Sequence, residues 1–455
     1  MKNGKRSSFS GKLGYVLAAA GASVGLGNIW RFPYLAAKYG GGIFLIIYIV
    51  LALTFGYTMI VAETAIGRMT RKSPVGAFKS FGKKKWLSFG GWINAVIPVL
   101  IVPYYSVIGG WVIKYLVEYF RGNAKLLAED GYFTDFISNG VSTELCFVAF
   151  CAFTLIIIFA GVQNGIERVS KIMMPILIVL SVIIAVYSVT RPGALAGVKY
   201  FLVPNVKNFS WMTVVSAMGQ MFYSLSIAMG ILITFGSYMK KDTAIEDSTR
   251  NVEIFDTGIA IMAGLMIIPA VFAFSGGDPD TLQAGPSLMF ITIPKVFQNM
   301  GFGTVIGIVF FLLVLFAAVT SSIALTESAV STFEDELGWG RKKATVLVGV
   351  IMLALGSLSS LGYGPLAGIK IIGMQFLDLF DFLTNSVMMP IAALLTSLFV
   401  SRVVGIDKIE AEIIHGESTF RRKKVFVVMI KYLCPVFAII ILLSSVANAL
   451  GWIKM

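Results

Sequence analysis

Residues 21–28 read Gly21-Ala22-Ser23-Val24-Gly25-Leu26-Gly27-Asn28, and they lie inside a segment that is otherwise apolar enough to cross a membrane. Glycines at this density weaken a helix, because glycine loses the most backbone freedom when it is ordered. In lipid, every backbone amide and carbonyl must nevertheless find a partner. A span that breaks at this depth therefore needs a cavity or a ligand for the freed polar groups. The stretch predicts a discontinuous helix that builds a binding site for a small charged solute.

The rest of the chain has the composition of an integral membrane protein. It contains 455 residues, 57% of them hydrophobic, and has a mean hydropathy of +0.84. A transmembrane helix needs ~20 apolar residues, and about eleven stretches reach that length. We expect an all-α membrane protein with spans near 12–37, 41–70, 87–120, 143–160, 165–190, 212–239, 252–275, 303–333, 344–362, 371–401 and 425–451.

The net charge of +13 does not indicate nucleic-acid binding, because the basic residues collect in alternate loops. Such alternation is what the positive-inside rule produces. It predicts a multi-pass protein of the plasma membrane with a cytoplasmic N-terminus, and eleven crossings would put the C-terminus on the extracellular side. The basic clusters lie within 2–12, 68–85, 168–171, 240–250, 341–343 and 402–424.

The sixth span is also interrupted, at Ser224-Leu225-Ser226-Ile227-Ala228-Met229-Gly230. Breaks at corresponding positions five spans apart indicate an inverted repeat of five plus five helices. We expect a single transporter domain over 1–455, with repeats over 12–190 and 212–401 and an extra helix over 425–451. The alternative is that the glycines only allow close helix packing. That reading leaves the accompanying Ser23, Asn28, Ser224 and Ser226 less well explained.

Three motifs resemble those of the neurotransmitter:sodium symporters, which have the leucine-transporter fold. The first is Gly25-Leu26-Gly27-Asn28-Ile29-Trp30-Arg31-Phe32-Pro33-Tyr34, and the others are Gln220-Met221-Phe222-Tyr223-Ser224-Leu225-Ser226 and Thr320-Ser321-Ser322. The resemblance covers nearly the whole chain and ends after the eleventh span, as in bacterial eleven-span amino-acid transporters. It implies a sodium-coupled symporter, not an enzyme, that imports neutral, hydrophobic L-amino acids by alternating access and functions as a monomer.

The resemblance also implies two sodium sites. Sodium prefers oxygen ligands, which replace its hydration shell. One site would use the carbonyls of Gly21, Val24 and Ala317 and the hydroxyls of Thr320 and Ser321. The other would use Ser23, Asn28, Ser224 and Asp256, beside the substrate carboxylate. The alternative for Thr320 and Ser321 is a hydroxyl that bonds back to its own helix.

Asp256 is an ionisable residue within an apolar span, and such residues are functional by default. Many members of the family have asparagine here and bind chloride nearby. The matching chloride positions are Tyr48, Gln220, Ser224 and Ala260, and the last offers no hydroxyl. We hypothesise that the Asp256 carboxylate supplies the negative charge, so that transport has no chloride requirement.

The substrate site implied by the resemblance lies between the two breaks. The amides near Leu26 and Gly27, with the Tyr105 hydroxyl, would bind a carboxylate. The carbonyls near Ala22, Tyr223, Ser224 and Ser226 would take the ammonium group, with Ser23 beside them. The side-chain pocket would consist of Ile101, Tyr223, Ala228, Met229, Ser321 and Leu325. It contains no charge, which predicts a neutral, apolar substrate. Ala228 replaces a frequent glycine, and we expect a preference for small or medium aliphatic side chains over tryptophan.

Two charge pairs match the gates of the family. Arg31 and Asp381 would form the outer gate, with Gln220 nearby and Tyr105 and Tyr223 as an aromatic lid. Arg6 and Asp335 would form the inner gate, beside Ser237 and Tyr238. Phe9 stands where the family usually has tryptophan, which keeps an apolar plug without the indole donor.

Two further features follow from the resemblance, and a third follows from the length and apolar patches of a loop. Glu63 would hold the unwound sixth helix through its amides. Gly165 and Pro175 enclose nine residues, a spacing of members whose fifth helix unwinds to admit water to a sodium site. The loop 276–300 would be a lid over an outer vestibule, or else a plain surface loop.

Two other functions were weighed. An intramembrane enzyme would have to use Glu63, Asp256 or Asp381, but the sequence has no zinc motif, no nucleophile with a paired base and no histidine within a span. A receptor-like member would bind substrate and move it poorly. The complete set of sodium ligands argues against this reading, and sodium-dependent accumulation in proteoliposomes would separate the two.

Overall fold

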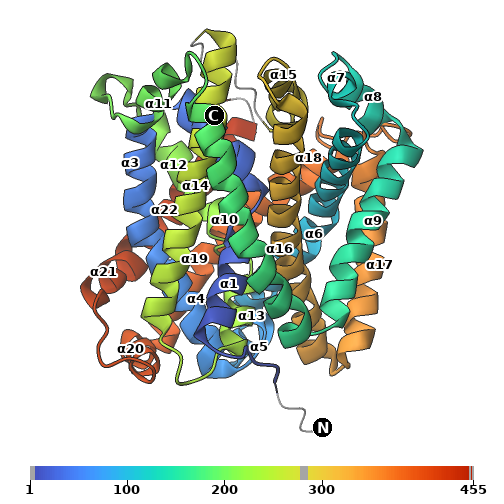
Figure 1. The fold of residues 1–455 in the computed structure, drawn as a ribbon. Coiled ribbons are helices and arrows are strands. Elements are labelled where there is room, and N and C mark those ends of the chain that lie inside the picture. Colours follow the sequence, from blue (N-terminus) through green and yellow to red (C-terminus); the bar gives the residue numbers. More distant parts are fainter. Residues whose placement is uncertain (1–5, 277–284, 450–451, 453–455) are drawn as a thin grey trace.

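The computed structural model describes residues 6–276, 285–449 and 452, and this part of the chain is built from helices (Figure 1). Among the described residues, nine helices are long and apolar enough to span a membrane. They are Gly42–Thr70 (α3, η2 and α4), Lys85–Phe120 (α6), Gly140–Phe159 (α9), Val162–Val189 (η3 and α10), Ile245–Ser275 (α14), Gly303–Leu337 (α16), Arg341–Leu361 (α17), Phe376–Val404 (α18 to η8) and Lys423–Asn448 (α21 to α22).

A tenth span is bent. Lys12–Ser23 (α1) and Gly27–Lys38 (η1 and α2) pass the same test together and meet at 54°. The sixth predicted span consists of Trp211–Ser224 (α12) and Ile231–Tyr238 (α13), each too short to span alone. The all-α membrane fold with interrupted first and sixth helices is thus confirmed, whereas the count of eleven stays a prediction.

The break between α12 and α13 has a visible backbone cause. Ser226 and Ala228 have φ values of 53° and 59°, and Gly230 has a φ of 69°. A right-handed helix cannot continue through residues in the left-handed region. The chain therefore leaves helical geometry after Ser224 and resumes it at Ile231.

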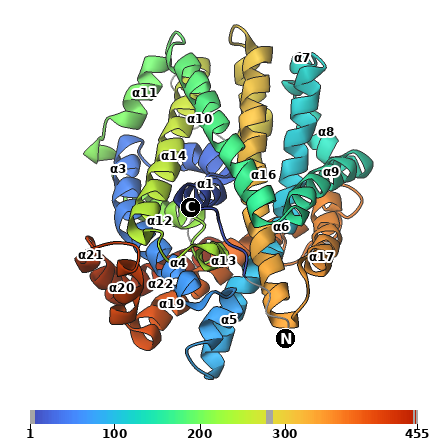
Figure 2. The ribbon, with the colours of Figure 1, turned by 60° about the horizontal axis from the view of Figure 1, so that its bottom comes forward.

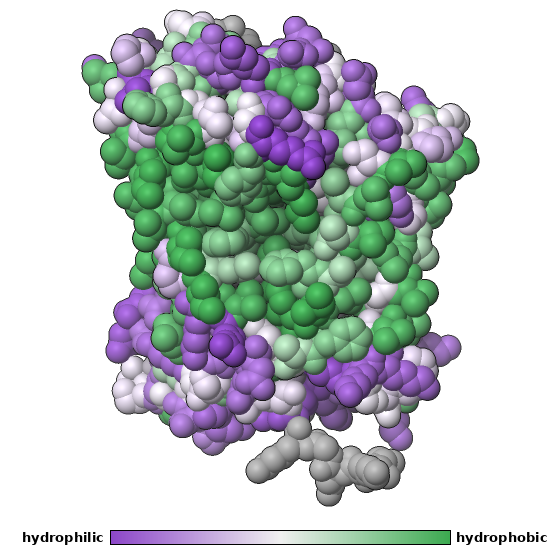
Figure 3. All heavy atoms as spheres, turned by 45° about the vertical axis from the view of Figure 1, so that its right-hand side comes forward, coloured by the Kyte–Doolittle hydropathy of each residue, from purple (hydrophilic) through white to green (hydrophobic). Residues whose placement is uncertain are grey.

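A hydrophobic belt crosses the middle of the face shown in Figure 3, between two hydrophilic ends. The lower end in Figure 1 carries Pro74–Lys79 (α5) and Ile406–Ile414 (α20), and α1 begins there. The upper end carries Ala124–Leu127 (α7), Tyr132–Ser138 (α8), Ala194–Leu202 (α11) and Ile293–Gln298 (α15). This distribution is what a multi-pass membrane protein requires, because lipid contacts only the belt.

The first helix lies at the centre of the bundle (Figure 2). There α1 packs against α10, α14 and α16, while α13 packs against α4. The two breaks meet, since the Ser226 hydroxyl donates to the Ala22 carbonyl at 3.0 Å. The fold thereby brings freed backbone groups from two distant parts of the chain to one place.

The fifth span does not unwind between Gly165 and Pro175 in this structure. A π-helical turn, Val162–Glu167, continues into Arg168–Val189 with Pro175 inside it. A Cβ on Gly165 would lie 2.1 Å from the Ile157 carbonyl oxygen, so this glycine allows close backbone packing. Proline still removes one backbone hydrogen bond from the helix, and the role of the pair in unwinding stays a prediction.

Candidate functional site

A cavity of about 30 Å³ lies where the two broken helices meet. Twelve of the thirteen predicted substrate-binding residues line it, and Gly25, Asn28 and Ile231 complete the wall. The predicted residues are Ala22, Ser23, Leu26, Gly27, Ile101, Tyr105, Tyr223, Ser224, Ser226, Met229, Ser321 and Leu325. The structure therefore brings together residues that are spread over some three hundred positions of the sequence.

Backbone polar groups form one end of this cavity. The Leu26 amide donates to the Tyr105 hydroxyl at 3.3 Å, and the Gly25 amide donates to Asn28 Oδ1 at 3.3 Å. A Cβ on Gly25 would lie 2.7 Å from Ser321 Oγ and 3.2 Å from the Tyr105 hydroxyl. Only glycine leaves room at this point, so the backbone itself forms the wall.

Another part of the cavity lining is apolar. Ile101, Met229, Ile231 and Leu325 line it together with the Tyr223 ring, and the described lining contains no charged side chain. Such a surface binds apolar groups by excluding water from them. Met229 adds an unbranched side chain that can fit several shapes.

The remaining predicted pocket residue, Ala228, does not line the cavity. Its φ of 59° turns this residue away, and its amide donates to Glu63 Oε1 at 2.8 Å. The predicted effect of its methyl group on the pocket floor therefore has no support in the structure, and neither does the expected discrimination against tryptophan. The contact with Glu63 agrees with the predicted role of this carboxylate, which is wholly buried.

Asp256 lies on α14 in a fully buried cluster of hydrogen-bond donors. Its carboxylate accepts from Asn28 Nδ2 at 2.8 Å, from the Tyr48 hydroxyl at 3.0 Å and from the Ser224 hydroxyl at 2.9 Å. Two of these donors, Asn28 and Ser224, also line the cavity. Ser23 differs, because its hydroxyl donates to Ala19 of its own helix at 3.1 Å. Ala260 and Gln220 are not among the hydrogen-bond partners of Asp256.

The sodium site predicted from Gly21, Val24, Ala317, Thr320 and Ser321 lies between α1 and α16. Ser321 Oγ is 3.3 Å from the Gly21 carbonyl, 3.2 Å from that of Ala22 and 3.4 Å from that of Val24. The Thr320 hydroxyl bonds back to Ala317 at 3.2 Å. These six oxygens come from a helix break and a facing helix, which is the donor set that a hard monovalent cation prefers.

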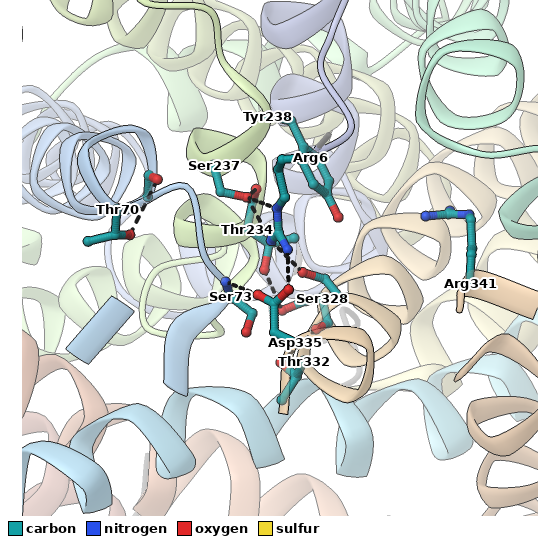
Figure 4. Close-up of polar contacts among 12 residues, drawn as sticks. Arg6, Thr70, Ser73, Thr234, Ser237, Tyr238, Ser328, Thr332, Asp335 and Arg341 are labelled. Atoms are coloured by element: carbon teal, nitrogen blue, oxygen red, sulfur yellow. Dashed lines mark hydrogen bonds and ion pairs between the residues drawn. The ribbon is translucent and has the colours of Figure 1, made fainter. Parts of the chain in front are cut away.

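At the lower end the predicted gate is closed (Figure 4). Arg6 Nη1 pairs with Asp335 Oδ1 at 2.5 Å, and Arg6 also donates to Ser237 at 2.9 Å. The guanidinium lies 5.0 Å from the centre of the Tyr238 ring. The other Asp335 oxygen accepts from the Ser73 amide at 2.6 Å, and so ties the start of α5 to the gate.

Beside this pair, Phe9 is buried and packs edge-on against Tyr15, Phe235 and Tyr238. Burial and the neighbouring Arg6 charge lower the pKa of the Arg71 guanidinium, which donates to the Met239 carbonyl at 2.7 Å. The lower end is thus closed by an apolar plug with a layer of charge below it.

At the upper end a cavity of about 520 Å³ lies above the site. Arg31 and Asp381 both line it, but the ion pairs of the described residues do not join them. Asp381 accepts from the Tyr104 hydroxyl at 3.2 Å and from Asn385 at 2.6 Å. Arg31 lies 5.4 Å from the centre of the Tyr223 ring. The predicted outer pair is therefore not closed in this conformation.

Two further predictions concern this upper cavity. Gln220 donates to the Gly27 carbonyl at 3.1 Å, and so it braces the broken first helix. Gly285 and Pro286 of the predicted lid line the cavity, while residues 277–284 of that lid lie outside the described part of the chain.

Sequence reasoning missed part of the lower gate. Glu327, wholly buried in α16, pairs with Arg341 at 2.6 Å and accepts from Tyr238 at 2.7 Å. An ionisable residue in an apolar span is itself a signal, and it could have identified Glu327. Ser73 gave no such signal, because only its backbone amide takes part.

Comparisons with known proteins agree with this geometry. The sequence matches the sodium:neurotransmitter symporter family over residues 6–127 and 133–451. It is 34% identical over 450 residues to the uncharacterized sodium-dependent transporter YhdH of Bacillus subtilis, which covers 98% of this chain and 99% of that protein. It is 32% identical over 460 residues to an uncharacterized sodium-dependent transporter of Haemophilus influenzae, with 97% and 99% covered.

The structure is also similar to the crystal structure of MhsT in complex with L-phenylalanine. The TM-score is 0.86 at 35% identity, over 97% of this chain and 100% of that one. Proteins of this kind are transporters and not enzymes. The chain therefore belongs to the sodium:neurotransmitter symporter family and is a sodium-coupled membrane transporter with the leucine-transporter fold.

Proposed function

We propose that this transporter imports neutral, hydrophobic L-amino acids. The observation that carries the proposal is the cavity lining, which combines backbone amides and the Tyr105 hydroxyl with apolar side chains. The similar protein MhsT has been solved with L-phenylalanine bound, which supports a hydrophobic amino acid as substrate. This lining favours one orientation of a bound amino acid, because its charged groups and its side chain need different surroundings.

In this proposal the substrate carboxylate meets the amides of Leu26 and Gly27. These amides begin the second half of the broken helix, where the helix dipole and free N–H groups attract an anion. The ammonium group meets the carbonyls near Ala22, Tyr223, Ser224 and Ser226. In this conformation the Ala22 carbonyl accepts from the Ser226 and Ser321 hydroxyls. A zwitterion is thereby recognised without any charged side chain.

We place two sodium ions beside the bound amino acid. The first is bound by Gly21, Val24, Ala317, Thr320 and Ser321. Support comes from the Ser321 hydroxyl, which contacts the Gly21 and Val24 carbonyls. The Thr320 hydroxyl, which contacts the Ala317 carbonyl here, must turn towards the ion. The second is bound by Ser23, Asn28, Ser224 and Asp256, next to the substrate carboxylate. For this second site, the Ser23 hydroxyl must turn from the Ala19 carbonyl that it contacts here.

Chloride is not required in this account. The Asp256 carboxylate lies against Tyr48 and Ser224, two of the positions that match the chloride site of the family. A fixed negative charge at this place balances a sodium ion, and a second anion would be repelled in the low dielectric of the interior.

Transport follows alternating access, in which sodium and substrate favour closed states by binding them more tightly. The lower end is the cytoplasmic end, so that the N-terminus is cytoplasmic and the C-terminus extracellular in the plasma membrane. Every proposed ligand comes from one chain, and a monomer is therefore sufficient.

The test is uptake into proteoliposomes under an inward sodium gradient, with a potassium gradient as control. Uptake of labelled alanine, valine, leucine, phenylalanine and tryptophan ranks the substrates that the pocket accepts. Gluconate in place of chloride tests whether transport requires chloride. We expect sodium-dependent, chloride-independent accumulation of the hydrophobic members. Binding without accumulation would favour the receptor-like alternative, and accumulation of charged amino acids alone would overturn the proposed substrate class.

A further inference from the structure

An apolar surface extends over the upper end of the molecule between α10 and α12. Its side chains have exposed fractions of 42% to 79%. We call it the upper rim, and it consists of Leu195, Leu202, Val203, Val206, Phe209 and Trp211. Figure 1 shows α11, the first part of this segment, lying crosswise at the upper end and reaching outward past α3.

The backbone of the upper rim is fixed without burial of these side chains. A Cβ on Gly41 would lie 2.1 Å from the Tyr200 carbonyl oxygen, and a Cβ on Gly42 would lie 2.5 Å from the Val203 carbonyl carbon. Gly41 also bridges Pro204. The glycine turn before α3 thus allows a backbone contact that no other residue would permit.

Local hydrogen bonds order the rest of the segment. Asn205 Oδ1 accepts from the Lys207 amide at 3.1 Å, and Ser210 and Thr213 form a capping box at the start of α12. The rings of Phe209 and Trp211 lie edge to face at 5.8 Å. An ordered segment that leaves contiguous apolar side chains exposed indicates a binding surface.

The helix α11 has a buried apolar face and two exposed leucines beside it. Ala194, Gly197 and Phe201 are buried, and a Cβ on Gly197 would lie 2.8 Å from Pro269 Cα of α14. Leu195 and Leu202 are exposed beside this buried face, seven positions apart, which is about two helical turns. The exposed part of α11 also carries Lys199, so it combines large apolar side chains with a cation, as a helix at the boundary between lipid and water does.

The position of the upper rim identifies that medium as lipid. The exposed residues Ile46 and Val50 of α3 and Leu53 of η2 form a lipid-facing strip, which begins about one turn below the Gly41 contact. The span Gly42–Thr70 has 29 residues. At about 1.5 Å per residue it is ~43 Å long, whereas the hydrocarbon layer is ~30 Å thick. The first turn of α3, and the rim beside it, therefore lies at the level of the lipid headgroups.

The charges beside the upper rim agree with this level. Lys199 and Lys207 are exposed, and among the described residues neither has an ion-pair partner. Tryptophan is enriched at membrane interfaces, and lysine extends its ammonium group towards lipid phosphates. We propose that the upper rim is a lipid-binding surface that inserts Val206, Phe209 and Trp211 at the headgroup boundary and places both lysines on lipid phosphates.

A spin label on Val206→Cys tests the proposal in vesicles of phosphatidylethanolamine and phosphatidylglycerol. Power saturation compares its collisions with oxygen, which collects in lipid, and with a water-soluble nickel chelate. Ile46→Cys on α3 is the lipid reference, and Glu129→Cys, exposed between α7 and α8, is the water reference. The chain without an added cysteine gives the background from the three natural ones.

We expect the ratio of oxygen to nickel collisions at Val206 to lie between those of the two references. A ratio equal to that of Glu129 would overturn the proposal. Low collision rates with both reagents, together with broadening between labels, would show a second copy on the surface and would also overturn it.

A second measurement needs no cysteine. Lipids brominated near the headgroup end of the acyl chain quench tryptophan at that depth. The chain has seven tryptophans, and the difference in fluorescence quenching between the unchanged chain and Trp211→Phe reports on Trp211 alone. We expect the loss to be larger with these lipids than with lipids brominated near the chain end. No difference between Trp211→Phe and the unchanged chain in either lipid would contradict insertion.

Discussion

At the lower end Arg6 pairs with Asp335 at 2.5 Å, whereas at the upper end Arg31 and Asp381 contact other residues above a cavity of about 520 Å³. Both ends carry an arginine and an aspartate that match gate positions. Only one end is closed by its pair, as alternating access requires of any single conformation. The conformation described here is therefore open towards the upper end.

The partners of the two aspartates explain how the ends can differ. Asp335 depends on a charged partner and on the Ser73 amide, so it loses a strong interaction when Arg6 leaves. Asp381 accepts from the neutral Tyr104 hydroxyl and Asn385 amide, and so it stays satisfied without Arg31. Charge-assisted hydrogen bonds are about twice as strong as neutral ones. A charged pair thus keeps the lower end closed. The upper end can open with a small loss of interaction energy, because Asp381 keeps its neutral partners.

The largest effect should come from Arg68, which is wholly buried at the lower end. Its Nε lies 2.8 Å from Glu412 Oε1, and it also donates to the Thr243 carbonyl, so that it ties α20 to the end of α4. We expect Arg68→Met to lower the free energy of unfolding by about 3 kcal/mol, because it leaves a buried carboxylate with a weaker partner. Thermal unfolding in detergent measures this change.

Lys241→Met is the matched control for Arg68→Met. Lys241 contacts the same carboxylate at 2.7 Å, but its side chain is 54% exposed. We expect a loss of about 1 kcal/mol or less, because solvent screens an exposed pair. Equal effects of the two variants would contradict the view that burial makes the lower end rigid.

The next effect concerns the lower gate itself. Asp335→Asn removes the charge that holds Arg6, which should favour opening by about 2 kcal/mol. A cysteine placed at Thr234, buried near the gate (Figure 4), should then react roughly 30-fold faster with a water-soluble thiol reagent. Glu336→Gln, which breaks the neighbouring exposed pair with Lys79, should leave the rate nearly unchanged. A faster reaction of this cysteine in both variants would show that the lower end loosens generally and that Asp335 has no specific role in the gate.

A smaller effect is expected at the proposed sodium site. Asp256→Asn should raise the sodium concentration for half-maximal uptake about tenfold, which is about 1.4 kcal/mol. Uptake should then become stimulated by chloride, since the fixed charge is gone. Asp378→Asn in the upper cavity removes an equal charge away from the site and serves as control. Unchanged sodium dependence in Asp256→Asn would remove this residue from the site.

The smallest effect is expected at the upper gate. Asp381→Asn should change the thermal stability of the substrate-free protein by less than about 1 kcal/mol, because its present partners are neutral. Compared with Asp335→Asn in the same assay, it should be clearly milder. A larger loss in Asp381→Asn would reverse the comparison between the two ends.

Much of this architecture could be predicted from the sequence. Long apolar stretches fix the spans, because lipid leaves helices as almost the only choice. The glycines at 21–27 predict the first break, and the site residues followed from motifs that resemble a known family. Twelve of the thirteen predicted substrate residues indeed line one cavity.

The failures have physical reasons too. The sequence does not show that Ala228 adopts a φ of 59°, which takes its methyl group out of the cavity wall. A charge pair such as Arg31 and Asp381 forms in some conformations only, and a motif carries no information about which one is described. The Ser73 amide donates to Asp335 through the backbone. Nearly every residue type has such an amide, so the sequence does not indicate which ones make a contact.

The central claim is that the cavity at the two helix breaks binds the amino acid together with sodium. Equilibrium binding of labelled L-phenylalanine, with and without sodium, tests it in Gly25→Ala and in Gly258→Ala. A Cβ at Gly25 would lie 2.7 Å from Ser321 Oγ, whereas a Cβ at Gly258 meets nothing within 4 Å. We predict sodium-dependent binding in the unchanged chain and in Gly258→Ala, and its loss in Gly25→Ala. Full binding in a folded Gly25→Ala protein would contradict the account.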